Sequence, residues 1–437
     1  MQSRQICKNG RRRRRSCKTS KNVSPAAISI AMSHKSASTY AEEVSLAQLF
    51  LIFFKIGCIS WGGYMALISV VRSEVVGKHR LLDDDEIMDG VALAMLLPGP
   101  VAVNVVAYVG DKIRGPLGGA VCAAAVILPS FFLMVGFAAL YLSWGTMVVA
   151  DKALAGVLPA IAAIILNAGW KMRAKALQGP IDMAMAAIAA VLLLTVGGIW
   201  IVVCIFAVAA VIGILRHQSA EAETPTPTAR QHSTFGIGSR VVVLLLTVCI
   251  GLFLFLPQMN VTSVLLQLFS VFSGMSLLLF GGGYIFIPMI QEAVVNAHGW
   301  LSLEDFGASI ALGQVTPGPI LISATFIGYK VAGLAGAVVA TVAIFAPPAA
   351  LIILAARQLE RFSHLARFKA AQAGIRSAVF GMIIAAALSL LMGIANEAAN
   401  LLAPAAIFAL SCVVLMYLKK SEIWTVVIAA VLGMLVF

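Results

Sequence analysis

Two Pro-Gly-Pro triplets break apolar runs of the sequence, and their residue types are suited to binding an anion. They are Pro98-Gly99-Pro100 and Pro317-Gly318-Pro319. Proline lacks a backbone donor and clashes with the preceding turn, so each triplet ends a helix. Proline also suits the first turn of the next helix, whose unpaired N–H groups carry partial positive charge. The triplets therefore predict two half-helix N-termini that bind an anion without a formal cation, a simple kink being the alternative.

Polar residues and a second pair of breaks accompany these triplets. Asn104, Thr316 and Ser323 lie close enough to a triplet to add side-chain hydrogen bonds to a bound anion. The second breaks are glycine-rich and are followed by tyrosine: Gly62, Gly63 and Tyr64 in one case, and Gly282, Gly283 and Tyr284 in the other. Glycine lets a backbone approach a substrate or another helix. These residues are therefore either part of the site or a small-residue packing interface.

Ionisable residues within or beside apolar runs are candidates for charge pairing or proton coupling, because they are costly in a membrane. They are Lys55, Glu74, Glu292 and Lys330. Lys55 either pairs with the anion or extends to the interface, and each glutamate either exchanges protons or is an interfacial carboxylate. The histidines and cysteines lack metal-ligand spacing, and no phosphate-binding loop motif is present. We therefore expect no metal, no cofactor and no enzymatic activity.

The composition places these residues in a membrane. The chain of 437 residues is 61% hydrophobic and 11% charged, whereas soluble domains have roughly 45–50% apolar and about 25% charged residues. We expect an all-α polytopic protein of the cell inner (plasma) membrane. The net charge of +12 includes five arginines, Arg11–Arg15. They indicate a disordered, cytoplasmic basic tail over residues 1–45 rather than a nucleic-acid-binding segment, and Met32 is an alternative start of the chain.

Apolar runs predict about 13 membrane spans arranged in two repeats. Residues 46–215 form the first repeat, whose first two spans are 47–76 and 87–110. A cytoplasmic linker over 216–240 and a connecting span over 241–256 follow. Residues 257–437 form the second repeat, whose first two spans are 262–295 and 306–329.

The two halves match each other at an offset of 218–220 residues. Besides the triplets and the glycine breaks, Gly115 matches Gly333 and Pro129 matches Pro347. Six spans and the connecting span precede the second repeat, and this odd count predicts an inverted copy with the C-terminus outside. Lysine and arginine concentrate in the loops predicted to lie inside, in agreement with the positive-inside rule. Inverted repeats with paired broken helices are typical of transporters.

These duplicated motifs resemble the chromate ion transporter family in its long, two-sector form. The resemblance is strongest over 280–289, 314–320 and 326–331 and covers roughly residues 45–437. It implies inverted halves and export of chromate from the cytoplasm, driven by the membrane potential or the proton gradient, with sulfate as a competitor. In the first half, relatives usually carry Gly-Gly-Pro where this chain has Gly62-Gly63-Tyr64. The residues themselves do not separate chromate from sulfate or another oxyanion.

Three functions remain in competition at this point. The favoured one is a secondary active oxyanion transporter, whose partners are the oxyanion, the lipid bilayer and, as a further expectation, a second copy in a homodimer. An anion channel built on the same repeats is the alternative, and uphill flux separates it from a transporter. A membrane enzyme acting on a lipid phosphate would need clustered carboxylates or histidines, which the sequence does not show.

The inverted repeats make one prediction that labelling can check. Single cysteines that replace Gly115 and Gly333 should react with a membrane-impermeant reagent from opposite sides of the membrane, because matched positions of inverted repeats face opposite sides. The measurement is accessibility in intact cells against inverted vesicles. Labelling of both positions from one side would end the inverted arrangement.

Overall fold

The computed structural model describes residues 44–61, 64–144, 148–223, 263–279, 286–359, 366–397 and 400–437. Its regular elements are all helices. The first half contains α2 (Leu46–Ile59), α3 (Tyr64–Arg72), the π-helical turn η1 (Ser73–Lys78), α4 (Asp84–Leu96), α5 (Val101–Trp144), α6 (Val148–Ala176), α7 (Pro180–Thr195) and α8 (Ile199–Glu223). The second half contains α10 (Val264–Leu278), α11 (Phe286–Gln291), the π-helical turn η4 (Glu292–Ala297), α12 (Leu303–Val315), the 3₁₀ turn η5 (Ile320–Ile322), α13 (Ser323–Leu359), α14 (Ala366–Glu397), α15 (Leu402–Cys412), the π-helical turn η6 (Val413–Tyr417) and α16 (Glu422–Val436).

The predicted all-helical membrane class is confirmed. Among the described residues, four helical stretches are long and apolar enough to cross a membrane: Val101–Ser143, Lys152–Ala176, Ile320–Leu354 and Ala370–Asn396. Nearly all of the predicted basic tail and the whole connecting span lie outside the described residues. Of the predicted linker, the part up to Glu223 continues helix α8.

α5 and α13 each reverse direction at a matched glycine. Gly115 has φ 67° in α5 and Gly333 has φ 59° in α13, a conformation that glycine adopts without strain. Gly110 lies against the backbone of Gly118, and Gly328 lies against that of Gly336. Eight residues of straight helix would separate each pair by about 12 Å, so the chain folds back. α5 therefore consists of a short arm, 101–113, and a long arm. In the second half, η5 and the start of α13 together form the short arm, 320–331, and the rest of α13 is the long arm.

The short arms fold back once more, onto α4 and α12. Gly90 of α4 packs against the ring of Tyr108, although 18 residues of continuous helix would hold them about 27 Å apart. In the second half, Lys330 Nζ lies 2.7 Å from Asp305 Oδ1. Each Pro-Gly-Pro triplet thus forms the tip of a helical hairpin.

This geometry differs from the predicted spans 87–110 and 306–329, in which a helix broken at the triplet still crosses the membrane. α4 and α12 have 13 residues each, or about 20 Å of helix, against about 30 Å of membrane hydrocarbon. Span 47–76 is broken in the same way, because Lys55 of α2 reaches Glu74 of η1. Hydropathy shows that such segments are apolar, but it cannot distinguish a chain that crosses the membrane from one that turns back at the break.

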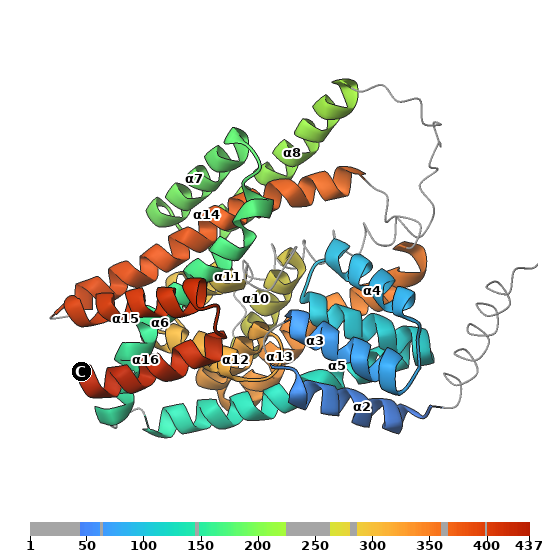
Figure 1. Ribbon diagram of the computed structural model, residues 1–437, viewed down its shortest axis with the longest axis horizontal. Helices are drawn as coiled ribbons and strands as arrows, with labels where there is room; N and C mark the ends of the chain where they lie inside the picture. The colour runs from blue at the N-terminus through green and yellow to red at the C-terminus, as the bar shows by residue number, and fades with distance from the viewer. Residues whose placement is uncertain are drawn as a thin grey trace, which may run out of the picture.

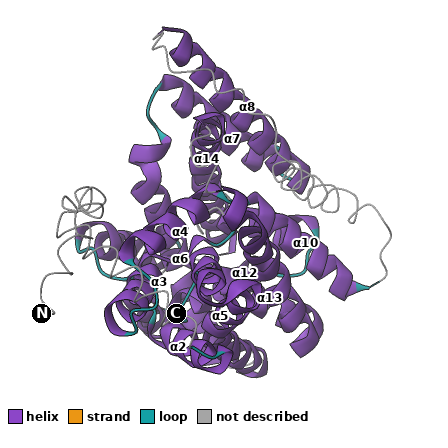
Figure 2. Cartoon of the chain, turned by 90° about the vertical axis from the view of Figure 1, so that its right-hand side faces the viewer, coloured by secondary structure: helices purple, strands orange, loops and turns teal. Residues whose placement is uncertain are grey.

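α5 and α13 pack along each other. α2 packs against α5, and α10 packs against α13. Figure 1 shows α2, α3 and α4 gathered at one end and α6, α15 and α16 together at the other end, with α5 extending from the first group toward the second. α7 and α8 pack on α14 and extend away from the rest of the molecule (Figure 2).

Small residues set the spacing in this outer group. Gly374 of α14 lies against the backbone of Ala209 on α8, and Gly381 lies against that of Ala186 on α7. Close backbone approach of this kind is the usual means of helix association in membranes. A polar cluster adds to it: Arg216 donates to the buried Asp182, and Ser377 Oγ lies 3.2 Å from the same carboxylate.

The close approach at Gly381 makes a stability prediction. Gly381→Ala should lower the stability of the protein by about 1–3 kcal/mol, because the added methyl group meets the backbone of Ala186. Gly136→Ala is the matched control, since nothing lies within 4 Å of the added methyl group. The measurement is the thermal unfolding midpoint in detergent. Equal midpoints for the two variants would contradict the packing described for α7 and α14.

Candidate functional site

The first Pro-Gly-Pro tip is buried and is held by its own helix. Gly99 has φ 106°, which allows the chain to reverse between α4 and α5. The side chain of Asn104, one turn into the short arm, donates from Nδ2 to the carbonyl oxygen of Pro98 at 3.0 Å. Asn104 is fully buried, and its Oδ1 has no hydrogen-bond partner among the described residues. The amide of Asn104 therefore closes the tip and leaves an acceptor beside it.

The second tip has the same backbone shape with different side chains. Gly318 has φ 109°, close to the value of its counterpart. Thr316 Oγ1 donates to Gly313 O at 2.9 Å, and Ser323 Oγ donates to Ile320 O at 2.9 Å. We predicted from the sequence that both hydroxyl groups could donate to a bound anion. In the structure both donate to backbone carbonyl groups beside the tip instead.

Each tip is bonded to the opposite half of the chain. The amide of Gly99 donates to the carbonyl oxygen of Leu279 at 2.7 Å, and the amide of Gly318 donates to that of Ser60 at 2.9 Å. Gly318 follows Gly99, and Leu279 follows Ser60, by the same 219 residues. Ser60 and Leu279 immediately follow α2 and α10, at the glycine-rich breaks. The Pro-Gly-Pro tip of each half is therefore bonded to the chain beside the glycine-rich break of the other half.

The long arms of α5 and α13 cover the tips from the opposite half in the same crossed manner. Gly99 faces Pro348 of α13, and Gly318 faces Ser130 of α5. The hydroxyl of Ser130, which is fully buried, donates to the carbonyl oxygen of Pro317. A Cβ atom at either glycine would collide with these residues, so both tips require glycine for space as well as for conformation.

Some of these contacts were missed by sequence reasoning. Ser60, Ser130, Leu279 and Pro348 were not among the predicted site residues. A signal was present for two of them, because Ser130 and Pro348 directly follow the matched prolines Pro129 and Pro347. Of the predicted glycine-break residues, Gly62, Gly63, Gly282, Gly283 and Tyr284 lie outside the described residues, and Tyr64 is the first residue of α3.

The predicted ionisable residues are not brought together at the tips. Lys55 forms an ion pair with Glu74 at 2.8 Å. Lys330 pairs with Asp305, which also accepts from the Tyr141 hydroxyl at 3.0 Å. Glu292 lies on η4 and accepts hydrogen bonds from Gly198 and Asn296. The tips therefore offer backbone and amide groups rather than formal charges.

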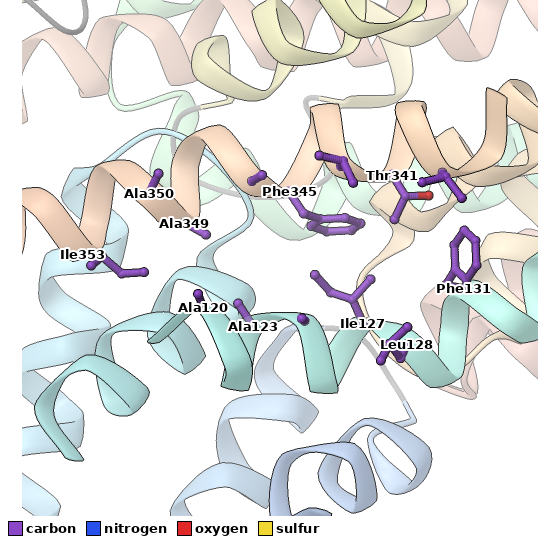
Figure 3. A pocket seen from close by; sticks show the side chains of 14 residues that line it. Ala120, Ala123, Ile127, Leu128, Phe131, Thr341, Phe345, Ala349, Ala350 and Ile353 are labelled. Carbon is purple, nitrogen blue, oxygen red and sulfur yellow. The ribbon is translucent and has the colours of Figure 1, made fainter. Parts of the chain in front are cut away.

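An apolar groove of about 480 Å³ lies between the long arms of α5 and α13. Figure 3 shows Ile127 and Phe131 of α5 facing Phe345 and Thr341 of α13 across it. The hydroxyl of Thr341 is already bonded to Thr325 and to Ala337 O. The groove lining is apolar apart from this engaged hydroxyl, so the groove does not suit an anion.

Comparison with known proteins finds relatives that match nearly the whole chain. A model described as "Chromate transporter" matches the chain twice, over residues 47–214 and 266–434. A chromate transport protein of Pseudomonas aeruginosa is 29% identical over 400 residues, which cover 90% of this chain and 93% of the relative. One of Cupriavidus metallidurans is 28% identical over 91% of this chain and 94% of the relative. An uncharacterized transporter of Methanocaldococcus jannaschii is 28% identical over 90% and 94%, respectively. No solved structure matches the chain.

The crossed contact at the second tip can be tested on its own. Ser130→Ala should cost about 1–3 kcal/mol of stability, because the buried carbonyl group of Pro317 loses its donor. Ser309→Ala is the matched control, since Ser309 is equally buried but donates to Phe306 O within its own helix. The measurement is thermal unfolding together with oxyanion flux in vesicles. If Ser309→Ala lowered the unfolding midpoint and the flux as much as Ser130→Ala, the bond from Ser130 to the second tip would contribute no more than a bond within one helix.

Proposed function

The chain belongs to the chromate transporter family, and from that premise we propose that it is a secondary active transporter exporting a tetrahedral oxyanion, chromate first, from the cytoplasm. A sulfate-like anion is the expected competitor, because it presents the same arrangement of acceptor oxygens. The observation that carries the proposal is the pair of buried, crosswise-bonded Pro-Gly-Pro tips. The proposal is of a transporter rather than an enzyme.

The first tip supplies donors suited to such an anion. The first N–H groups of a helix have no partner within it, and here they belong to the buried residues Val101, Ala102 and Val103. Together with the helix dipole they attract negative charge. No formal cation is needed at the tip, which avoids the cost of a buried, unpaired lysine or arginine when the site is empty.

We further propose that the halves are inverted, with the N-terminus cytoplasmic and the C-terminus outside in the inner membrane. The hairpins favour about nine membrane crossings in place of the expected 13. In each half, two of the expected crossings become hairpins that enter and leave the membrane on the same side. The first half loses an even number of crossings. An odd number of crossings therefore still precedes the second repeat, and the repeats stay inverted. The loop after η1, with Lys78 and Arg80, moves to the cytoplasmic side, in better agreement with the positive-inside rule.

An alternating-access cycle follows from this arrangement. The tips are tied to opposite halves, so a rocking of one half against the other would move both tips together. Coupling to the proton gradient or to the membrane potential makes the flux active. A channel on the same scaffold is the second candidate, and it differs by never moving the anion uphill.

The flux assay that tests the proposal uses inverted membrane vesicles and radiolabelled chromate. Export from cells corresponds to uptake by these vesicles, so the wild-type protein should accumulate chromate above the external concentration when energised, and unlabelled sulfate should reduce this. Replacing Pro317-Gly318-Pro319 by three alanines should lower uptake at least tenfold, because the tip is rebuilt as helix. The control is Pro159→Ala, a buried helix proline of α6 away from the tips. Full uptake in the triple variant, or only downhill equilibration by the wild-type protein, would refute the transporter with this site.

A further inference from the structure

Two glutamates occupy matched positions in the halves but have opposite surroundings. Glu74 and Glu292 are 218 residues apart. Glu74 is the second residue of the π-helical turn η1, and Glu292 is the first residue of the π-helical turn η4. Glu74 lies 2.8 Å from Lys55, 3.5 Å from Lys78 and 3.6 Å from His79. The charge of Glu74 is therefore neutralised by its neighbours.

Glu292 is buried, with 3% of its surface exposed, and the described groups that donate to its oxygens are neutral. The backbone amide of Gly198, in the turn between α7 and α8, donates to Oε1. The side chain of Asn296 donates from Nδ2 to Oε2 at 2.8 Å. Asn296 occupies the position that Lys78 has in the first half. Within the described ranges, no cationic side chain pairs with this carboxylate.

Charged groups on the neighbouring elements do not supply the missing cation. On α12, Asp305 is engaged by Lys330, and Glu304 is itself acidic. On α8, Arg216 is bonded to Asp182. His298 follows η4 and stacks on Trp300, and burial lowers the pKa of its ring, which is therefore neutral near pH 7. On α11, Gln291 bonds to Ser389.

A buried carboxylate without a cation is costly, and hydrogen-bond donors, a metal ion or a proton can each lower that cost. A hard metal cation requires several oxygen ligands around it. Glu292 instead has two N–H donors as neighbours, and the described residues contain no cluster of three or more metal-ligating side chains. The two N–H donors stabilise the ionised carboxylate in place of a cation and do not form a metal-ligand set, so a proton rather than a metal ion is the cation that can neutralise Glu292.

We propose that Glu292 is the group that takes up and releases the proton coupled to oxyanion transport, whereas Glu74 is a fixed ion-pair partner. This inference rests on the proposed function. The carboxylate gains a proton on Oε1 and becomes a carboxylic acid, and the hydrogen bond from Gly198 N–H to that oxygen breaks. Release of the proton restores the carboxylate and the bond.

Protonation of Glu292 therefore changes how the outer helices are held. Gly197 and Gly198 have φ of 61° and 91°, and the turn they form contacts the core element η4 through Glu292. α7 and α8 pack on α14, and α14 also packs along α6. The proton thus acts on the bond between the α7–α8 turn and η4, which belongs to the half of the molecule that carries the second tip.

The test uses the purified full-length protein in liposomes that contain a pH-sensitive dye. An imposed chromate gradient should move protons through the wild-type protein. Glu292→Gln should reduce this proton movement at least tenfold, while exchange of labelled for unlabelled chromate stays within about threefold of wild type. Glu74→Gln, the matched control, should retain both. Wild-type proton movement in Glu292→Gln, or an equal loss in Glu74→Gln, would overturn the assignment.

A second variant keeps the inference testable if Glu292→Gln fails to fold. Asn296→Asp places two carboxyl groups side by side, which resist simultaneous ionisation. The pH at half-maximal chromate flux should rise by about one unit or more, whereas a purely structural Glu292 would leave the profile unmoved and refute the proposal. Chromate flux without any proton movement in the wild-type protein would overturn this inference alone. No chromate flux at all would overturn the proposed function itself.

Discussion

An amide that a helix break exposes in apolar surroundings must find an acceptor, and in this protein each break finds it in the other half of the chain. Gly99 donates to Leu279 and Gly318 donates to Ser60. These two bonds require both hairpin tips to reach the centre and both long arms to lie over them. The close packing of α5 on α13 follows from that requirement. The need for glycine follows too, because the tip faces Pro348 in one half and Ser130 in the other.

The backbone of the two halves is nearly the same at the tips, and the side chains are not. Asn104 closes the first tip and keeps one acceptor unpaired, whereas hydroxyl groups close the second. Ser130 donates to the opposite tip, but its counterpart Pro348 has no donor to offer. Glu74 is surrounded by cations and Glu292 by amides. The duplicated scaffold thus places side chains of different chemistry at matched positions of its two halves.

Much of this arrangement could be predicted from the sequence. Composition indicated a helical membrane protein, and the repeated triplets located both tips. The hairpins could not be predicted, because residues 87–110 are equally apolar whether the chain continues through Pro98-Gly99-Pro100 or turns back there. The crossed contacts of Ser60 and Ser130 depend on residues that are far apart in sequence and carry no unusual local pattern. Lys330 illustrates the same difficulty, since its partner Asp305 lies beside it only once the hairpin is formed.

The crossed bonds also set an order on biosynthesis. Leu279 follows Gly99 by 180 residues, so at about 5–20 residues per second the first tip waits roughly 10 to 40 s before its acceptor is made. Ser60, by contrast, is already synthesised when Gly318 emerges. During the delay the first half holds a polar group without its final partner in or near the lipid. The second half inserts against a neighbour that is already in place, and the protein matures as one unit rather than as two independent domains.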